Sequence, residues 1–315
     1  MDSGFMTGNG VHLSTSFNNL TFADPFPSGP LLVYYIDKIR WNEKAFERLV
    51  IDPKEKELIK ALVDAHTARS KPSNESKLND IIEGKGNGLI ILLHGGPGTG
   101  KTLTAESVAE VSNKPLYRIT CGDIGTNAEE IEKNLPDVLL FGTIWGCVLL
   151  LDEADVFLEE RSEQDLQRNA LVSVFLRAIE YYDGILILTS NRVGTFDEAF
   201  KSRIQLALHL PPLKKDNRFH IWNNFIENLR ETNANAKFDQ LKAKLKALAR
   251  HELNGREIRN IVKVAQQLAQ SQGDTLEYRH FKQVIEVSVK FGEYLVDEHG
   301  HDASQWAREQ NRRAE

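Results

Sequence analysis

One glycine-rich segment has the residue types and the spacing needed to bind phosphate. It fits the pattern G-x-x-x-x-G-K-[ST], lies between a strand-like run and a helix-like one, and reads Gly95-Gly96-Pro97-Gly98-Thr99-Gly100-Lys101-Thr102. Glycines let backbone N–H groups curve around phosphate oxygens, and a helix N-terminus favours negative charge. Lys101 would reach the β- and γ-phosphates, and the Thr102 hydroxyl would ligate Mg²⁺. The segment therefore predicts a site for a nucleoside triphosphate and its metal ion.

Two adjacent carboxylates follow a second apolar run. The stretch from Val148 to Leu151 predicts a strand buried on both faces, and Asp152 and Glu153 come directly after it. Open α/β sheets bind ligands at this carboxyl edge. Asp152 would hold Mg²⁺, mostly through water, and Glu153 would orient and polarise an attacking water. The alternative is an acidic helix start, in which both carboxylates lie near a helix dipole.

Strand-like and helix-like segments alternate from Leu89 to Leu210. Such alternation predicts a parallel sheet covered by helices, and nearly continuous runs of Leu, Ile and Val are typical of strands buried on both faces. For the helix near residues 169–181, we expect the core-facing stripe to include Ala170, Val174, Ala178 and Tyr182. Beyond Pro211 and Pro212 the pattern is purely helical, which predicts a second domain.

Composition and charge narrow the possible classes of protein. With 315 residues, 41% hydrophobic and 27% charged, the chain lies in the globular range, and its net charge of −6 makes nucleic acid an unlikely partner. Two cysteines provide neither a disulfide framework nor a zinc site. No apolar run approaches the roughly 20 residues of a membrane helix. The first 25 residues lack Lys and Arg, unlike a signal peptide. We therefore expect an intracellular protein, cytoplasmic or nuclear, without a membrane span.

Further segments give the chain a family resemblance. The glycine loop and the Asp-Glu strand are accompanied by Thr189-Ser190-Asn191-Arg192 and by Phe196-Asp197-Glu198-Ala199-Phe200-Lys201-Ser202-Arg203. Together they resemble an AAA-type ATPase of the AAA+ superfamily, over about Leu31 to Phe291. The resemblance is greatest to large fungal AAA proteins, whose patterns are similar to Gly122-Asp123-Ile124-Gly125 and to the run from Arg168 to Arg177.

The resemblance implies an α/β fold of the P-loop NTPase type. Its parallel sheet, of order 5-1-4-3-2, would be sandwiched by helices and followed by a C-terminal helical lid. On this basis we expect a flexible arm (1–30), a linker and adenine-side segment (31–87), a nucleotide-binding core (88–211), the lid (212–292) and a charged tail (293–315). Trp41, Phe46 and Ile51 resemble the family's adenine-wrapping segment, although core packing explains them equally well.

The resemblance also implies roles for three polar residues. Asn191 would lie beside the γ-phosphate at the sensor-1 position, on a strand between those of Lys101 and Asp152. Arg203 would be an arginine finger for the neighbouring subunit's nucleotide, which requires a ring, expected to be a hexamer. Arg256 matches the sensor-2 position at a helix start. The alternatives are a turn cap for Asn191, a surface arginine for Arg203 and a solvated helix arginine for Arg256.

Two departures from the family pattern bear on function. Lys201 and Ser202 stand where many AAA proteins carry a second arginine, so hydrolysis would depend on Arg203 alone. The central pore loop, usually aromatic–aliphatic–glycine, aligns here with Asp123-Ile124-Gly125, which lacks the aromatic that would grip a polypeptide. Threading of a peptide is therefore in doubt.

The sequence as a whole favours an ATPase with ATP and Mg²⁺ as cofactors. Its hydrolysis would be coupled to the remodelling of a macromolecular client, most simply a protein. The main alternative is a nucleotide-gated oligomeric scaffold with negligible turnover. A DNA-processing machine is disfavoured by the net charge, and a GTPase by the missing guanine motif, because Asn113-Lys114-Pro115-Leu116 lacks its carboxylate.

Overall fold

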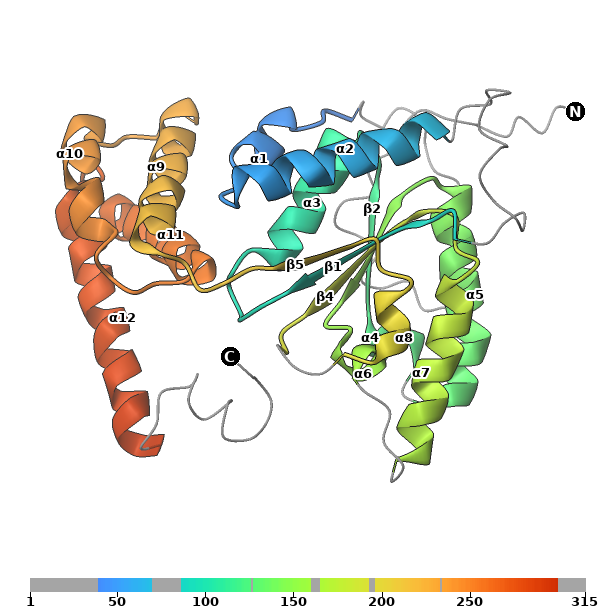
Figure 1. Cartoon of the computed structure of the whole chain (residues 1–315). Coiled ribbons are helices and arrows are strands. Elements are labelled where there is room, and N and C mark those ends of the chain that lie inside the picture. Colours follow the sequence, from blue (N-terminus) through green and yellow to red (C-terminus); the bar gives the residue numbers. More distant parts are fainter. Residues whose placement is uncertain are drawn as a thin grey trace, which may run out of the picture.

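A five-stranded parallel sheet forms the centre of the computed structural model, which describes residues 39–69, 86–125, 127–159, 165–192, 196–232 and 234–299. The strands are β1 (Leu89–His94), β2 (Leu116–Thr120), β3 (Val148–Asp152), β4 (Ile185–Ser190) and β5 (Leu206–His209). Their order is β2-β3-β4-β1-β5, which confirms the expected 5-1-4-3-2 (Figure 1). Because β4 lies between β1 and β3, the carboxyl ends of these three strands are neighbours.

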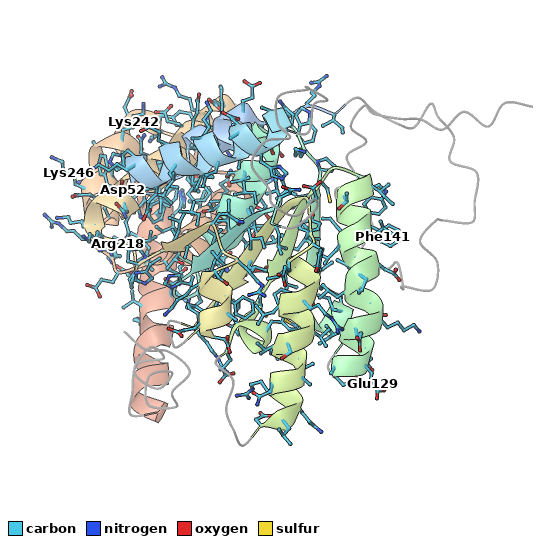
Figure 2. The ribbon with its side chains drawn as sticks, turned by 45° about the vertical axis from the view of Figure 1, so that its right-hand side comes forward. Asp52, Glu129, Phe141, Arg218, Lys242 and Lys246 are labelled. Carbon is cyan, nitrogen blue, oxygen red and sulfur yellow. The ribbon has the colours of Figure 1, made fainter. Side chains whose placement is uncertain are left out.

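Helices cover both faces of the sheet because the strands are apolar on both sides. Strand β1 contributes Leu89, Ile91 and Leu93 to one face, and Ile90 and Leu92 to the other. The first face is covered by α1 (Glu43–Glu47), α2 (Pro53–Arg69) and α3 (Lys101–Val111). The second is covered by α4 (Cys121–Ile124), α5 (Ala128–Ile144), α6 (Asp155–Leu158), α7 (Leu166–Ile179) and α8 (Glu198–Lys201). Figure 2 shows Glu129 and Phe141 toward opposite ends of α5.

Helix α7 packs against the sheet through a stripe that only partly overlaps the one we expected, because Val174 and Ala178 pack against the edge of the core. Its buried residues are Leu171, Val172, Phe175, Leu176 and Ile179. Of the expected stripe, Ala170 is exposed, Val174 and Ala178 are half-buried, and only Tyr182, beyond the helix, is buried. The larger side chains face the core because they remove more apolar surface from water than alanine does.

Four helices beyond β5 form a separate group with its own core, the lid (Figure 1). They are α9 (Lys215–Glu231), α10 (Phe238–Leu248), α11 (Gly255–Ser271) and α12 (Tyr278–His299). Trp222 and Phe281 are fully buried in it. Helix α12 continues to His299, past residue 292, where we expected the tail to begin. Lys242 and Lys246, labelled in Figure 2, lie on α10 of the lid. Within the described ranges, no helix is long and apolar enough to cross a membrane.

Helix α1 ties the lid to the core. Arg48 Nη2 lies 2.6 Å from Glu231 Oε1 on α9, and Lys44 Nζ lies 3.3 Å from the same oxygen. The side-chain amide of Asn224, also on α9, donates to the carbonyl oxygen of Arg48 at 2.7 Å. These contacts, the α1–α9 clasp, join segments that are distant in sequence.

Candidate functional site

The glycine-rich segment folds into a tight loop between β1 and α3. Gly95, Gly98 and Gly100 have φ angles of 149°, 73° and 107°, which residues with side chains rarely adopt. Gly95 also lies so close to the chain after β5 that an added Cβ would be 2.2 Å from the carbonyl oxygen of Leu210. Helix α3 begins at Lys101, so its first N–H groups have no carbonyl partner within the helix. This is the geometry of an anion-binding helix start.

Lys101 lies within the curve of this loop. Its side chain is buried, and Nζ donates to the carbonyl oxygens of Gly95 at 2.8 Å and Gly96 at 2.7 Å. Charge-assisted hydrogen bonds to anionic oxygen are stronger than those to neutral carbonyls. A phosphate bound in the loop would therefore be a better partner for this ammonium than the loop itself.

Asp152, the last residue of β3, lies next to the loop. It is buried, and its Oδ1 accepts a hydrogen bond from the Thr189 hydroxyl. Its Oδ2 lies 2.6 Å from Nη2 of Arg118 on β2. The Thr102 hydroxyl oxygen lies 3.4 Å from both carboxylate oxygens. The structure thus brings Thr102 and Asp152 together as expected, and adds Arg118, which our sequence analysis did not identify.

The Thr102–Asp152 pair fits a hard divalent cation. Both residues offer oxygen, the ligand type that Mg²⁺ prefers. Across the described part of the chain, no group of three or more His, Cys, Asp or Glu side chains could hold a metal ion. Mg²⁺ usually keeps several waters and binds through one or two protein groups and substrate phosphates. The pair therefore suits a metal ion that arrives with a nucleotide.

Glu153 follows Asp152 with a strained backbone. Its φ is +58°, a left-handed value that costs a non-glycine residue of order 1–3 kcal/mol. Two contacts hold this conformation: its N–H donates to Thr189 Oγ1 at 2.9 Å, and its carbonyl accepts from Cys121 Sγ at 3.1 Å. Glu153 is exposed. The strain therefore turns the chain at the strand end and leaves this carboxylate accessible to water.

Asn191 follows β4 directly beside the loop, because Ser190 pairs with His94, the last residue of β1. The turn is held by Asp155 on α6. Its Oδ1 accepts hydrogen bonds from the Ser190 hydroxyl, from the Asn191 N–H at 3.2 Å and from the Arg192 N–H at 3.3 Å. Asp155 therefore fixes the position of Asn191 relative to the acidic strand end, a role that its sequence position alone did not indicate.

Arg203 lies toward the end of the sheet where the strands begin, whereas the loop lies at the end where the strands finish. Arg203 precedes β5, whose first residue, Leu206, pairs with Ile91 in the middle of β1, whereas the loop follows the end of β1. Its Nη1 donates to the carbonyl of Ala199 at 2.9 Å, and its Nη2 lies 3.2 Å from Glu180 Oε2. The structure therefore does not bring Arg203 to the glycine loop of its own chain.

The lid touches the loop where α11 begins. The N–H of Gly255 donates to the carbonyl of Gly98 at 2.9 Å. Asn254 caps α11 by accepting from the Glu257 N–H, and the Glu257 carboxylate accepts in turn from the Asn254 N–H. Arg256, the next residue after Gly255, is exposed. The structure thus places the predicted sensor-2 residue beside a lid–loop contact that the sequence did not reveal.

Two family models match adjacent parts of this chain. The model described as "ATPase family associated with various cellular activities (AAA)" matches residues 91–212, and the "Fungal AAA+ ATPase lid domain" matches residues 213–302. The chain carries an AAA ATPase domain followed by a fungal AAA+ lid domain. The AAA match contains the glycine loop, the Asp152 strand end and Arg203, and the lid match contains α9 to α12.

Relatives of this AAA chain carry AAA domains in much longer proteins. ATPase family AAA domain-containing protein 3B of Homo sapiens is 31% identical over 160 residues, covering 47% of this chain and 25% of that protein. The protein 3A homolog of Drosophila melanogaster is 29% identical over 195 residues, covering 59% and 30%. Protein 3 of Xenopus tropicalis is 31% identical over 186 residues, covering 56% and 29%. The matched region spans less than a third of each relative.

The segment that aligns with the central loop of AAA proteins makes internal contacts here. Asp123 Oδ2 accepts hydrogen bonds from the N–H and the hydroxyl of Thr120, each at 2.7 Å, and so caps the short helix α4. Ile124 is fully buried in the core on the α5 side of the sheet. Ile124 is therefore not available as a grip, and the exposed Asp123 is hydrogen-bonded to Thr120.

Core packing accounts for Phe46, which we expected in a segment that wraps the adenine. Phe46 is buried against the α3 side of the sheet, and Ile51 packs partly against the same cluster. Trp41 is half-buried. The structure therefore gives Phe46 a structural role.

Two other groups near the AAA site are unsuited to acid–base or nucleophilic chemistry. His94 stacks on His209 with a ring separation of 5.0 Å, and burial, followed by the charges of His209 and Lys101, lowers its pKa. Its imidazole is therefore harder to protonate than an ordinary histidine, and it serves as a packing residue. Burial raises the pKa of the Cys121 thiol to about 12, so this thiol stays protonated.

Substitution of Gly98 tests the lid–loop contact of this AAA chain. Gly98 and Gly86 have nearly equal φ angles, +73° and +77°, so Gly→Ala imposes similar backbone strain at both. At Gly98 the new Cβ would also lie 2.4 Å from Asn254 Oδ1, whereas at Gly86 nothing lies within 4 Å. We expect Gly98→Ala to lose about 1–3 kcal/mol more unfolding free energy than Gly86→Ala, as measured in urea. Equal losses would mean that the Asn254 side chain moves aside at no cost in free energy.

Proposed function

We propose that this chain binds Mg·ATP at the carboxyl edge of its sheet and hydrolyses it. One observation carries the proposal: the loop of Lys101, the Asp152–Glu153 strand end and the Asn191 turn follow β1, β3 and β4, which are neighbours in the sheet. They supply a phosphate cradle, a metal ligand, an accessible carboxylate and an amide. Phosphoryl transfer is catalysed chiefly by such positioning and electrostatic stabilisation.

Each of these residues has a definable task in the reaction. Lys101 and the loop N–H groups would bind the β- and γ-phosphates. Thr102 and Asp152 would hold Mg²⁺, which when bound neutralises charge that develops on phosphate oxygens. Glu153 would accept a hydrogen bond from the attacking water and take its proton as the water oxygen bonds to the γ-phosphorus and the bond from that phosphorus to the leaving oxygen of ADP breaks. Asn191 would orient that water, with its turn held by Asp155.

The position of Arg203 supports a ring of subunits, which we propose to be a hexamer. Its guanidinium lies toward the opposite edge of the sheet from its own loop, so it can serve only the nucleotide of a neighbouring subunit. There it would stabilise transition-state charge as an arginine finger. Arg256, beside the lid–loop contact, would sense the γ-phosphate and pass its presence to the lid.

The work done by such a ring would be the remodelling of a macromolecular client, most simply a protein. Movement of the lid would follow from its contact with the loop at Gly98. Both cysteines are free thiols, which is typical of a reducing compartment and supports an intracellular location.

Replacement of Lys101 with methionine tests nucleotide binding. Methionine fills a similar volume without the charge, so we expect ATP affinity to fall about a hundredfold, because a buried charged partner of the phosphates is lost. Calorimetric titration with ATP in Mg²⁺ measures this. Lys114→Met is the control, since Lys114 binds the carbonyl of Gly146 at the far end of α3. Unchanged ATP affinity in Lys101→Met would rule out this binding site. A preference of the wild-type protein for GTP over ATP would contradict the proposed nucleotide.

A scaffold with negligible turnover is the second candidate function. The observation that favours it is the internal use of Asp123 and Ile124, which leaves the central loop without a grip. An exposed Glu153 with a strained backbone favours hydrolysis instead. Release of phosphate from ATP by the assembled protein separates the two functions, because the scaffold would bind ATP and release none.

A further inference from the structure

The ion pair between Arg118 and Asp152 lies in the metal site but has no place in the mechanism above. Arg118 is on β2, the edge strand of the sheet, and its Nη2 is 2.6 Å from Asp152 Oδ2. The two side chains differ in access to water: Asp152 is 7% exposed and Arg118 is 54% exposed. The carboxylate is therefore fixed, whereas the guanidinium lies at the margin of the site and can move into solvent.

The buried carboxylate needs a counter-charge. An ionised carboxylate is costly to bury unless it is paired and hydrogen-bonded. In Asp152, Oδ1 accepts from Thr189, and Oδ2 is paired with Arg118. The Thr102 hydroxyl, 3.4 Å from both oxygens, is at the outer limit of hydrogen bonding. Arg118 thus supplies Asp152 with a positively charged partner.

The charge of Arg118 also acts on a second carboxylate. Partial burial raises the pKa of Glu106 on α3, and the charges of Arg118 and of Arg259 on lid helix α11 act against that rise. When the guanidinium of Arg118 moves away from Asp152, the Glu106 carboxylate and water are available to stabilise its positive charge. The ion pair can therefore open without stranding an arginine in an apolar environment.

We propose that Arg118 is the resident counter-ion of Asp152 and is exchanged for Mg²⁺ when nucleotide binds. This inference rests on the proposed function. Two cations that share one carboxylate repel each other, so the guanidinium competes with a metal ion placed between Thr102 and Asp152. Arg118 therefore raises the Mg²⁺ concentration needed for tight nucleotide binding, and stabilises the protein when metal is absent.

The test is a Mg²⁺ titration of ADP binding, because ADP allows binding to be measured without turnover. A fluorescent ADP analogue, held below saturation, is titrated with Mg²⁺ in wild type, Arg118→Gln and Arg118→Lys. We expect the Mg²⁺ midpoint to fall about fivefold in Arg118→Gln, the size of effect typical of a partly exposed ion pair. In Arg118→Lys it should stay within about twofold of wild type, because the charge is kept. Arg177→Gln removes an exposed pair with Glu132 elsewhere and should change nothing.

Three outcomes would overturn the inference: a midpoint unchanged in Arg118→Gln, a midpoint raised in it, or one lowered equally by Gln and Lys. The first would mean no competition, the second a role in orienting Asp152, and the third a packing effect. Thermal unfolding without nucleotide and without metal gives an independent measurement. Arg118→Gln should unfold at a lower temperature than wild type, because Asp152 loses this counter-charge, and an unchanged unfolding temperature would contradict the counter-ion role. Failure of wild type to bind ADP at any Mg²⁺ concentration would sink the proposed function, and the thermal measurement would still decide the inference.

Discussion

Replacing Glu153 with glutamine is expected to lower ATP turnover about a thousandfold and to leave ATP binding intact. Glutamine keeps the size of the side chain but cannot take a proton from water. The left-handed backbone at residue 153, with φ +58°, is held by contacts of its N–H and carbonyl, so the substitution leaves it in place. Phosphate release and ATP affinity, measured on the same preparation, separate the two effects.

Glu132→Gln is a suitable control for this experiment. Glu132 is an exposed glutamate on α5 that pairs with Arg177, away from the acidic strand end. We expect its turnover to match wild type. Retained turnover in Glu153→Gln would remove Glu153 from its proposed task, and loss of ATP binding would show that its charge supports the site in another way.

Replacing Arg203 with alanine is expected to reduce turnover of the assembled protein about a thousandfold while each chain still binds ATP. The reason is the position of Arg203, toward the opposite edge of the sheet from its own loop. Arg203 also pairs with Glu180, and both side chains are about a quarter exposed, so some stability would be lost as well. Glu180→Gln removes that pair but keeps the arginine, and should retain turnover.

Mixing two inactive variants tests whether Arg203 acts on a neighbour. Lys101→Ala subunits have the arginine but no functional loop, and Arg203→Ala subunits have the loop but no arginine. Where the two meet in the right order, an intact loop faces an intact arginine, so the mixture should regain activity that neither variant has alone. A mixture no more active than its components would contradict the finger assignment.

Local patterns in the sequence predicted the strands and the glycine loop, whereas the order of the strands was implied by the family resemblance. Apolar runs mark strands that are buried on both faces, and the glycines of the loop are needed where φ is positive, as at Gly98. Contacts across the chain were not predictable in the same way. The register that brings Arg118 to Asp152, and the fold that brings Gly255 to Gly98, depend on packing between segments far apart in sequence.

The stripe on α7 shows a different limit. A spacing of four residues from Ala170 fits a helix face, but so does the spacing of the larger residues Leu171 and Phe175, which the structure buries instead. Periodicity locates a helix, whereas the size of the side chains decides which face turns inward. Asp155 likewise has its role only because α6 places it beside the turn after β4.

The α1–α9 clasp and the bond from Gly255 to Gly98 hold the lid at two separate points. A rigid body pinned at two points is free only to rotate about the line that joins them. A small displacement of the glycine loop would thus become a swing of all four lid helices about that line (Figure 1).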